Sequence, residues 1–244
     1  MIDSTTNREL LAELAAQYRI ELDEQECALM LRHLDLLVET NKVMNLTRIT
    51  EPIDAIVRHV IDSLLILPTA QRFGMGIGKS FADMGTGGGF PGIPIGITSG
   101  MDGLLIDSVQ KKIGAVTSFI EHLGMSDQLE AKSCRAEELA KERFEDFDMV
   151  TARAVAELNV LVEYASPLLT RGGYLIVSKA RIQDEEIYAG DKTAHIVGLK
   201  RVSRETYELP YDTGHREIIA YQKVAKSRVK LPRGTGMAKH KPLV

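Results

Sequence analysis

The sequence predicts an α/β fold, a doubly wound and mostly parallel sheet that is preceded by helices and ends with an antiparallel strand. Three observations support this prediction. The middle of the chain alternates short apolar runs with helix-like runs, which is the pattern of βαβ units. A glycine-rich stretch, FADMGTGGGFPG at 81–92, coincides with the end of the first apolar run. Two strand-like runs at 199–210 and 217–225 flank a polar turn and predict an antiparallel hairpin.

Three helices are expected before the sheet. Apolar residues fall on one helical face over 5–18, and they do so again after a possible cap at Asp23. The third helix is expected over 50–68, with Thr50 as its cap and Pro68 as its end. These helices would pack on the core as an N-terminal extension.

The sheet is expected to begin near residue 80. Its parallel strands are predicted at 80–85, 103–108, 129–133, 148–154 and 173–180. The helices between and after them are predicted at 93–99, 111–124, 135–144, 158–169 and 184–190. We therefore expect three parts: an N-terminal helical extension at 1–68, a Rossmann-like domain at 69–225 and a basic C-terminal tail at 226–244.

The composition indicates an ordinary globular protein of a reducing compartment. The 244 residues are 44% hydrophobic and 26% charged, enough to bury a core. Cys27 and Cys134 lie far apart and form no C-x-x-C pair, which favours a cytoplasmic protein over a secreted one. The most apolar window, VIDSLLILP at 60–68, is too short to span a membrane and contains Asp62. The six histidines have no paired spacing, so we expect no metal site. We also expect a monomer.

Charge is distributed unevenly along the chain. The net charge is −4, but the segment from Lys223 to Val244 holds seven Lys or Arg and no acidic residue. Such a tail is a candidate contact for nucleic-acid phosphates, and a solvated, mobile terminus is the equally simple alternative. The candidate phosphate contacts are Lys179, after the fifth strand, and Arg228, Lys230, Arg233 and Lys239 in the tail.

The glycine-rich loop indicates a bound ligand, because in open α/β sheets ligands lie beyond the carboxyl ends of the strands. Its spaced glycines are Gly85, Gly87 and Gly89. A dinucleotide fingerprint would need a glycine where Phe90 stands. Pro91 and Pro94 also remove N–H donors from the first turn of the next helix. A cofactor without a pyrophosphate therefore fits this loop better than a dinucleotide.

Acidic and small residues follow the next two strands. Asp107 lies 18 residues beyond Gly89, where a carboxylate can accept hydrogen bonds from ribose hydroxyls. Ala136 and Glu137 follow the third strand and could read an adenine ring. Taken singly, Asp107 could be a helix cap, and the other two could be an ordinary first helical turn. Their order on consecutive βα units favours S-adenosylmethionine, whose positive charge and amino group Asp83 would suit.

The loop after the fourth strand bears on the methyl acceptor. Its sequence, MVTARAVAELN, lacks the Asn- or Asp-Pro-Pro-aromatic motif that accompanies methylation of exocyclic amines, and it holds no cysteine nucleophile. Arg153 stands there instead, and it could close over the cofactor, steer a phosphate or form an ion pair. Guanine N7 offers a lone pair without a proton, so transfer to it needs alignment rather than a general base. We expect no catalytic acid or base.

Several motifs in register resemble a known family. They are NKVMNLTRIT, RHVIDSL, DMGTGGGFPGIPI, IDSVQKK, CRAEEL, TARAVAEL and PRGTGMAKHKPL. From about Asn41 onward the chain is similar to the small-subunit ribosomal RNA guanine-N7 methyltransferase family, also known as glucose-inhibited division protein B. In the tail, Met237 stands where the family more often has proline.

The resemblance implies a class I methyltransferase fold, S-adenosylmethionine as methyl donor, and a guanine of 16S ribosomal RNA or of the small ribosomal subunit as substrate. The cofactor contacts that it implies are Gly85, Phe90, Ala136, Glu137 and Arg153. Other residues in family-like blocks, which helix caps and packing explain almost as well, are Asn45, Arg58, His59, Asp62 and Ser63. The alternative functions are a nucleotide-dependent dehydrogenase with an atypical glycine loop and a non-catalytic cofactor-binding module that docks to the ribosome through its tail.

Overall fold

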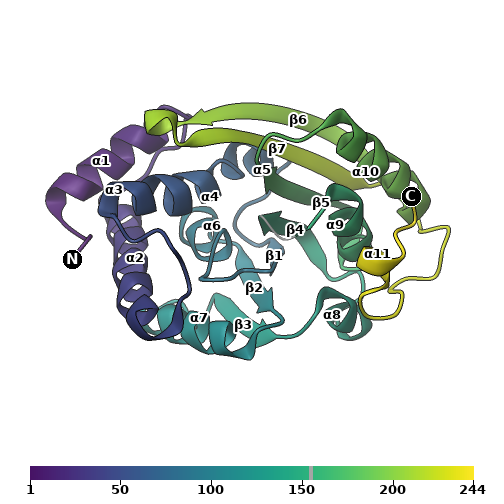
Figure 1. Ribbon diagram of the computed structural model, residues 1–244, viewed down its shortest axis with the longest axis horizontal. Helices are drawn as coiled ribbons and strands as arrows, with labels where there is room; N and C mark the ends of the chain where they lie inside the picture. Colours follow the sequence, from purple (N-terminus) through teal and green to yellow (C-terminus); the bar gives the residue numbers. More distant parts are fainter. Residues whose placement is uncertain (154–155) are drawn as a thin grey trace.

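A seven-stranded sheet forms the centre of the protein in the computed structural model, which describes residues 1–153 and 156–244 (Figure 1). The strands are β1 (Ser80–Met84), β2 (Asp102–Asp107), β3 (Leu129–Ser133), β4 (Phe147–Arg153), β5 (Leu169–Lys179), β6 (Leu199–Leu209) and β7 (Gly214–Lys223). They lie in the order β3-β2-β1-β4-β5-β7-β6. The first five strands are parallel, and β7 runs antiparallel to both β5 and β6. The predicted doubly wound sheet with a final antiparallel strand is confirmed.

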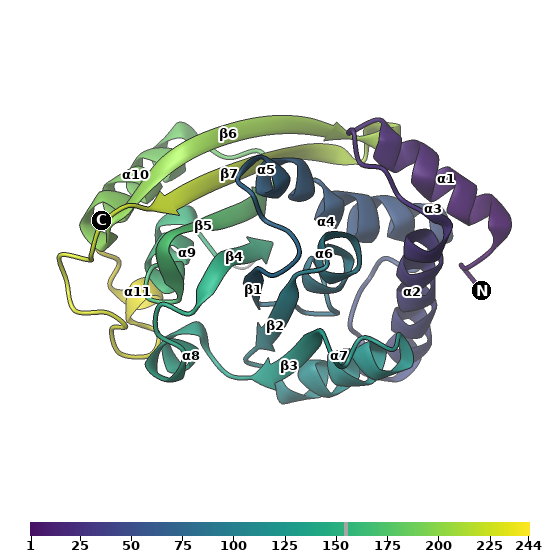
Figure 2. The same cartoon turned by 180° about the vertical axis from the view of Figure 1, so that it is seen from behind.

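Helices cover both faces of the sheet (Figures 1 and 2). Those before the sheet are α1 (Thr5–Ala16), α2 (Glu24–Met44), α3 (Pro52–Ala55), a π-helix (Ile56–Ile61), α4 (Asp62–Leu64) and α5 (Leu67–Arg72). The later ones are α6 (Gly92–Ser99), α7 (Gln110–His122), α8 (Ala136–Glu142), α9 (Leu158–Ala165), α10 (Asp184–Val197), a 3₁₀ turn (Pro210–Asp212) and α11 (Met237–His240). The helices before the sheet lie with α6 and α7 on one face, whereas α8, α9 and α10 cover the other.

The two faces of β1 show why this sheet must be covered on both sides. Phe81 belongs to the apolar cluster beneath the N-terminal helices, α6 and α7, while Ala82 and Met84 belong to the cluster beneath α8, α9 and α10. Successive side chains of a strand point to opposite faces, so an apolar run without alternation is buried on both. The N-terminal helices share their cluster with the sheet. The division of the chain at residue 68 stays a prediction.

The sequence predicts the starts of the early helices better than their ends. Asp23 caps α2 as expected, with a reciprocal bond from the Asp23 backbone to Glu26. The expected single helix over 50–68 is divided among α3, the π-helix, α4 and α5, and both of its predicted ends are wrong. Its N-cap is Glu51 rather than Thr50, and Pro68 lies in the first turn of α5 instead of ending the helix. Proline is compatible with a first turn, because its missing N–H would have no helical partner there.

Three later boundaries also differ from the prediction. α9 ends at Ala165, four residues before its predicted end at 169, and β5 starts at Leu169, four residues before its predicted start at 173. α10 continues to Val197, seven residues beyond its predicted end at 190. The predicted strand 148–154 is β4, and its last residue lies outside the described residues.

The C-terminal tail folds back onto the protein. The Arg228 N–H donates to the Ile196 carbonyl at 2.9 Å, and the Asn159 side chain donates to the Val244 carbonyl at 3.2 Å. Ala238 of α11 is buried, and α11 packs on α9 (Figure 2). The tail is thus a packed element rather than the mobile, solvated terminus that was the alternative. Among the described residues, every helix is too short or too polar to cross a membrane.

Candidate active site

The strand order reverses at β1, which pairs with β2 on one side and β4 on the other. In open α/β sheets a ligand binds beyond the carboxyl ends of the strands at such a point. The glycine-rich loop leads from β1 to α6 at this edge, and three cavities with shared walls lie around it.

We name the three cavities by their position and charge. The β2–β3 cavity, of about 280 Å³, is lined by Gly85, Asp107, Lys112, Ala136, Glu137 and Tyr164 among others. The central cavity, of about 170 Å³, is lined by Thr47, His59, Gly85, Thr86, Phe90 and Arg153 among others. The basic cavity, of about 670 Å³, is lined by five cations, Arg58, Arg153, Lys179, Arg181 and Arg216, together with acidic residues that include Asp62. Gly85 joins the first two cavities, and His59 and Arg153 join the last two.

The predicted loop glycines adopt the backbone conformation that favours glycine. The φ angles of Gly85, Gly87 and Gly89 are +76°, +59° and +95°. At Gly89 a Cβ atom would also lie 2.7 Å from Cδ1 of Ile93 and 3.0 Å from Nε2 of His33. The loop therefore needs glycine both for its shape and for its contact with α2 and α6.

Asp107 ties the glycine loop to the start of α7. Its Oδ2 accepts from the Gly87 N–H at 3.2 Å, and its Oδ1 accepts from the Val109 N–H at 2.9 Å. The Lys112 ammonium lies 3.7 Å from Oδ2. The carboxylate is 9% exposed and lines the β2–β3 cavity. It therefore both orders the end of β2 and presents acceptor oxygens beside the cavity.

Ala136 and Glu137 open α8 and line the same cavity as Asp107. Glu137 is buried, and its Oε1 accepts from the N–H of Gly236 in the tail at 2.7 Å. Tyr164 of α9 lines the same cavity. Burial, followed by the Glu137 carboxylate, raises the pKa of the Tyr164 hydroxyl to about 12, so it stays protonated at neutral pH.

Phe90 lies between two histidine rings. The centroid of His33 is 4.4 Å from that of Phe90, and the centroid of His59 is 4.8 Å away, each ring within 19° of parallel. Burial lowers the pKa of His33 to about 3, and burial with the nearby Arg153 lowers the pKa of His59 to about 4. Both rings are thus neutral at pH 7. The sequence analysis named Phe90 and His59 but did not predict that they stack, and it did not name His33.

Arg153 is held by an ion pair, one of the three roles considered for it. Its Nη1 lies 3.2 Å from Oδ2 of Asp62 and donates to the Arg58 carbonyl at 2.9 Å. Its guanidinium carbon is 5.6 Å from the Phe90 ring centroid. Asp62 also accepts from Nε of Arg216 at 2.9 Å. One buried carboxylate therefore holds two arginines in the wall of the basic cavity, and the sequence did not single out Arg216.

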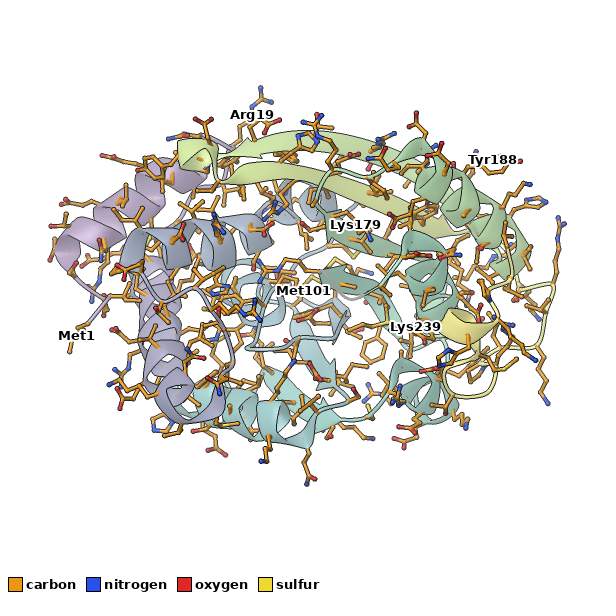
Figure 3. The ribbon with its side chains drawn as sticks, in the orientation of Figure 1. Met1, Arg19, Met101, Lys179, Tyr188 and Lys239 are labelled. Carbon is orange, nitrogen blue, oxygen red and sulfur yellow. The ribbon has the colours of Figure 1, made fainter. Side chains whose placement is uncertain are left out.

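The structure does not bring the candidate phosphate contacts together. Lys179 lies 2.7 Å from Oε1 of Glu186 and lines the basic cavity, whereas Lys239 lies on α11 (Figure 3). Arg233 donates to both carboxylate oxygens of Glu163. Arg228, Lys230 and Lys239 are exposed. Phosphate binding by these five residues stays a prediction.

Asp83, at the end of β1, orders the start of the helix that follows the glycine loop. It is fully buried, and its Oδ2 accepts from the Gly92 N–H at 2.9 Å, so it holds the start of α6. Burial raises the pKa of this carboxyl to about 7. Its Oδ1 has no hydrogen-bond partner among the described residues, and its contact with the charged amino acid part of the cofactor stays a prediction.

Several buried polar atoms around the glycine loop lack a hydrogen-bond partner in the described part of the chain. Thr86 Oγ1 and His59 Nδ1 belong to residues that line the central cavity. Buried polar atoms in native proteins are normally paired. Among residues 1–153 and 156–244, no three His, Cys, Asp or Glu side chains are grouped to hold a metal ion.

Comparisons with known proteins agree with this geometry. A family model described as rRNA small subunit methyltransferase G matches residues 26–213. The ribosomal RNA small subunit methyltransferase G of Desulfitobacterium hafniense is 37% identical over 98% of this chain and 98% of that protein. The protein of the same name from Lactobacillus acidophilus is 35% identical over 96% of this chain and 98% of its own length.

Solved structures show the same fold. A SAM-dependent O-methyltransferase from Thermotoga maritima superposes with a TM-score of 0.52 at 14% identity and covers 78% of this chain and 72% of its own. The TYW2 protein of P. horikoshii, solved in complex with MeSAdo, has a TM-score of 0.54 at 12% identity and covers 69% and 63%. The class I methyltransferase fold implied by the sequence motifs is confirmed.

Proposed function

The chain belongs to the rRNA small subunit methyltransferase G family, and from this premise we propose that it transfers a methyl group to N7 of a guanine in 16S ribosomal RNA. Membership makes it an S-adenosylmethionine-dependent rRNA methyltransferase. The family leaves the dehydrogenase alternative without support. The guanine N7 acceptor and a transfer without a general base are the further steps of the proposal.

The central cavity is the observation that carries this proposal. Among the residues that the structure describes, the titratable ones that line it are His59 and Arg153. A histidine with a pKa of about 4 is a weak proton acceptor at pH 7, and an arginine is a cation that does not give up its proton. A site with these groups suits an acceptor that loses no proton, which is the chemistry of guanine N7.

The β2–β3 cavity suits the adenosyl part of the cofactor. When bound, S-adenosylmethionine supplies an electrophilic methyl group on a sulfonium sulfur. We propose that Asp107 accepts hydrogen bonds from the ribose hydroxyls of the cofactor. We further propose that Ala136 and Glu137 contact its adenine ring. Gly85 and Gly87 let the main chain approach the ligand closely, because they carry no side chain at the cavity edge.

The basic cavity suits the nucleotide that receives the methyl group. Five cations against three acidic residues line it, so its charge favours a phosphate-bearing ligand. It meets the central cavity at His59 and Arg153, and we propose that the guanine enters along this path. Asp62 holds Arg153 and Arg216 in place through ion pairs. Phe90 stacks between His33 and His59 and so fixes the position of the His59 ring where the two cavities meet.

A methylation assay with radiolabelled S-adenosylmethionine and small ribosomal subunits or their deproteinised RNA tests the proposal. Reduction followed by aniline cleaves RNA at N7-methylguanine, so the label and the cleavage should map to one nucleotide. The pH profile of kcat/KM should also show no ascending limb between pH 6 and 8 that reports a general base of the free enzyme. Label on an exocyclic amine or a ring carbon would refute the N7 acceptor.

A further inference from the structure

The C-terminal tail (residues 226–244) contacts the wall of the β2–β3 cavity from behind. The Gly236 N–H donates to Oε1 of Glu137 at 2.7 Å. Arg233 donates to both oxygens of Glu163, at 2.7 and 2.6 Å. Glu137 lines the cavity, and Glu163 precedes Tyr164, which also lines it. Figure 1 shows α11 of the tail beside α8 and α9, the helices that carry these residues.

Burial makes the two carboxylates depend on the tail. Glu137 is 5% exposed and Glu163 is 4% exposed. A buried carboxylate is tolerated only where it is paired and hydrogen-bonded, and loss of the partner leaves a charge that must turn toward water. Arg233 and Gly236 are partners of this kind. Without them, the start of α8 and the middle of α9 would lose the contacts that hold them at their present separation.

The turn at Gly236 is shaped for this contact. Its φ angle of +77° is one that glycine adopts without strain, and it directs the backbone N–H toward Glu137. Ala238, two residues later, is buried, and its helix α11 packs on α9. Arg233, Gly236 and Ala238 thus anchor the tail at three neighbouring points, while Lys230 and Lys239 stay exposed.

We propose that the tail is a part of the cofactor site, in which Arg233 and Gly236 position Glu137 and Tyr164 and thereby set the affinity for S-adenosylmethionine. This inference rests on the proposed assignment of the adenosyl group to the β2–β3 cavity. It makes Arg233 a positioning residue of the cofactor site rather than a phosphate contact. Because coupling between two sites is reciprocal, a bound cofactor stabilises the docked tail by the same factor.

The first test measures cofactor binding by calorimetry in the absence of RNA. Arg233→Gln removes the two hydrogen bonds that the guanidinium donates to Glu163. The dissociation constant of this variant for S-adenosylmethionine should rise about tenfold, because a buried carboxylate loses its charged hydrogen-bond partner. Lys226→Gln is the matched control, because it removes an exposed tail charge outside the anchor. Its dissociation constant should stay within about twofold of the wild-type value. Equal constants for Arg233→Gln and wild type would overturn the inference.

The second test uses limited digestion with trypsin of the wild-type protein and of Arg233→Gln. Cleavage after Lys226 and Lys230 should slow about tenfold when S-adenosylmethionine is saturating, and Arg233→Gln without cofactor should be cleaved faster than wild type. Wild-type protein that binds the cofactor but shows unchanged tail cleavage would overturn the inference alone. Wild-type protein that does not bind S-adenosylmethionine would instead overturn the proposed function.

Discussion

Asp62 and Arg153 form an ion pair across the junction of two cavities, with Oδ2 of the carboxylate 3.2 Å from Nη1 of the guanidinium. Asp62 belongs to α4 and Arg153 ends β4, so the pair links the N-terminal helices to the sheet. The same carboxylate holds Arg216 of β7. The positions of these two arginine side chains in the wall of the basic cavity therefore depend on one buried carboxylate, which comes from a helix before the sheet.

Replacement of Asp62 should damage both stability and activity. Asp62→Ala leaves two arginines without their partner in a largely buried site, and we expect the free energy of unfolding to fall by about 3 kcal/mol. Urea unfolding measures this change, and methylation should drop at least tenfold under conditions where the variant is folded. The control Asp54→Ala breaks an exposed pair with Arg58 and should cost no more than about 0.5 kcal/mol. Equal effects of the two variants would contradict the account.

Asp107 should contribute directly to cofactor affinity. Asp107→Ala removes the acceptor oxygens beside the β2–β3 cavity, and binding of S-adenosylmethionine should weaken by roughly 1–3 kcal/mol in calorimetry. Asp102→Ala changes an exposed carboxylate at the other end of β2 and serves as the control. An unaltered dissociation constant for Asp107→Ala would remove this residue from the site.

The glycine loop should not tolerate a side chain at Gly89. A Cβ atom there meets Ile93 and His33 at 3.0 Å or less, on a backbone with φ of +95°. Gly89→Ala should therefore lower the free energy of unfolding by more than about 1 kcal/mol. Gly114→Ala in α7 is the matched control, because nothing lies within 4 Å of its added Cβ. It should stabilise the protein by up to about 1 kcal/mol. The prediction fails if thermal unfolding shows Gly89→Ala to be neutral.

The buried histidines should make stability depend on pH. The folded-state pKa values of His33 and His59, about 3 and about 4, lie below the unfolded value of 6.5. The unfolded chain then binds more protons between these values, so the stabilising contribution is present above pH 6.5 and is lost as the pH falls toward 4.

We test this dependence with His33→Gln, whose amide can still donate to the Gly88 carbonyl. Between pH 7 and pH 5 this variant should lose about 2 kcal/mol less stability than the wild type. His122→Gln, at an exposed position of α7, is the control and should keep the wild-type dependence. Parallel curves for His33→Gln and wild type would contradict the assignment.

The positions of the cavity residues followed from the sequence because parallel strands end at the same edge of a sheet. Once β1, β2 and β3 were recognised, the loop glycines, Asp107 and Ala136 had to lie close together. Each lies at the last residue of a strand or within a few residues after one, so local sequence order was sufficient. The helix and strand types were predictable for the same reason, since each has its own apolar period.

The partners of these residues could not be predicted in this way. Asp62 and Arg153 are far apart in the chain, and only the packing of the N-terminal helices on the sheet brings them together. The docking of Arg233 on Glu163 likewise depends on the path of a tail whose positive charge favours solvent and phosphate as readily as a buried acid. Charge alone does not choose among these partners.

The measurement that tests the central claim most directly is a map of 16S ribosomal RNA modifications in cells with and without this protein. We predict that one guanine loses its N7 methyl group in the deletion strain, and that the wild-type chain restores the methyl group whereas Asp107→Ala restores it poorly. An unchanged modification map, or the loss of a methyl group from any atom other than a guanine N7, would contradict the account.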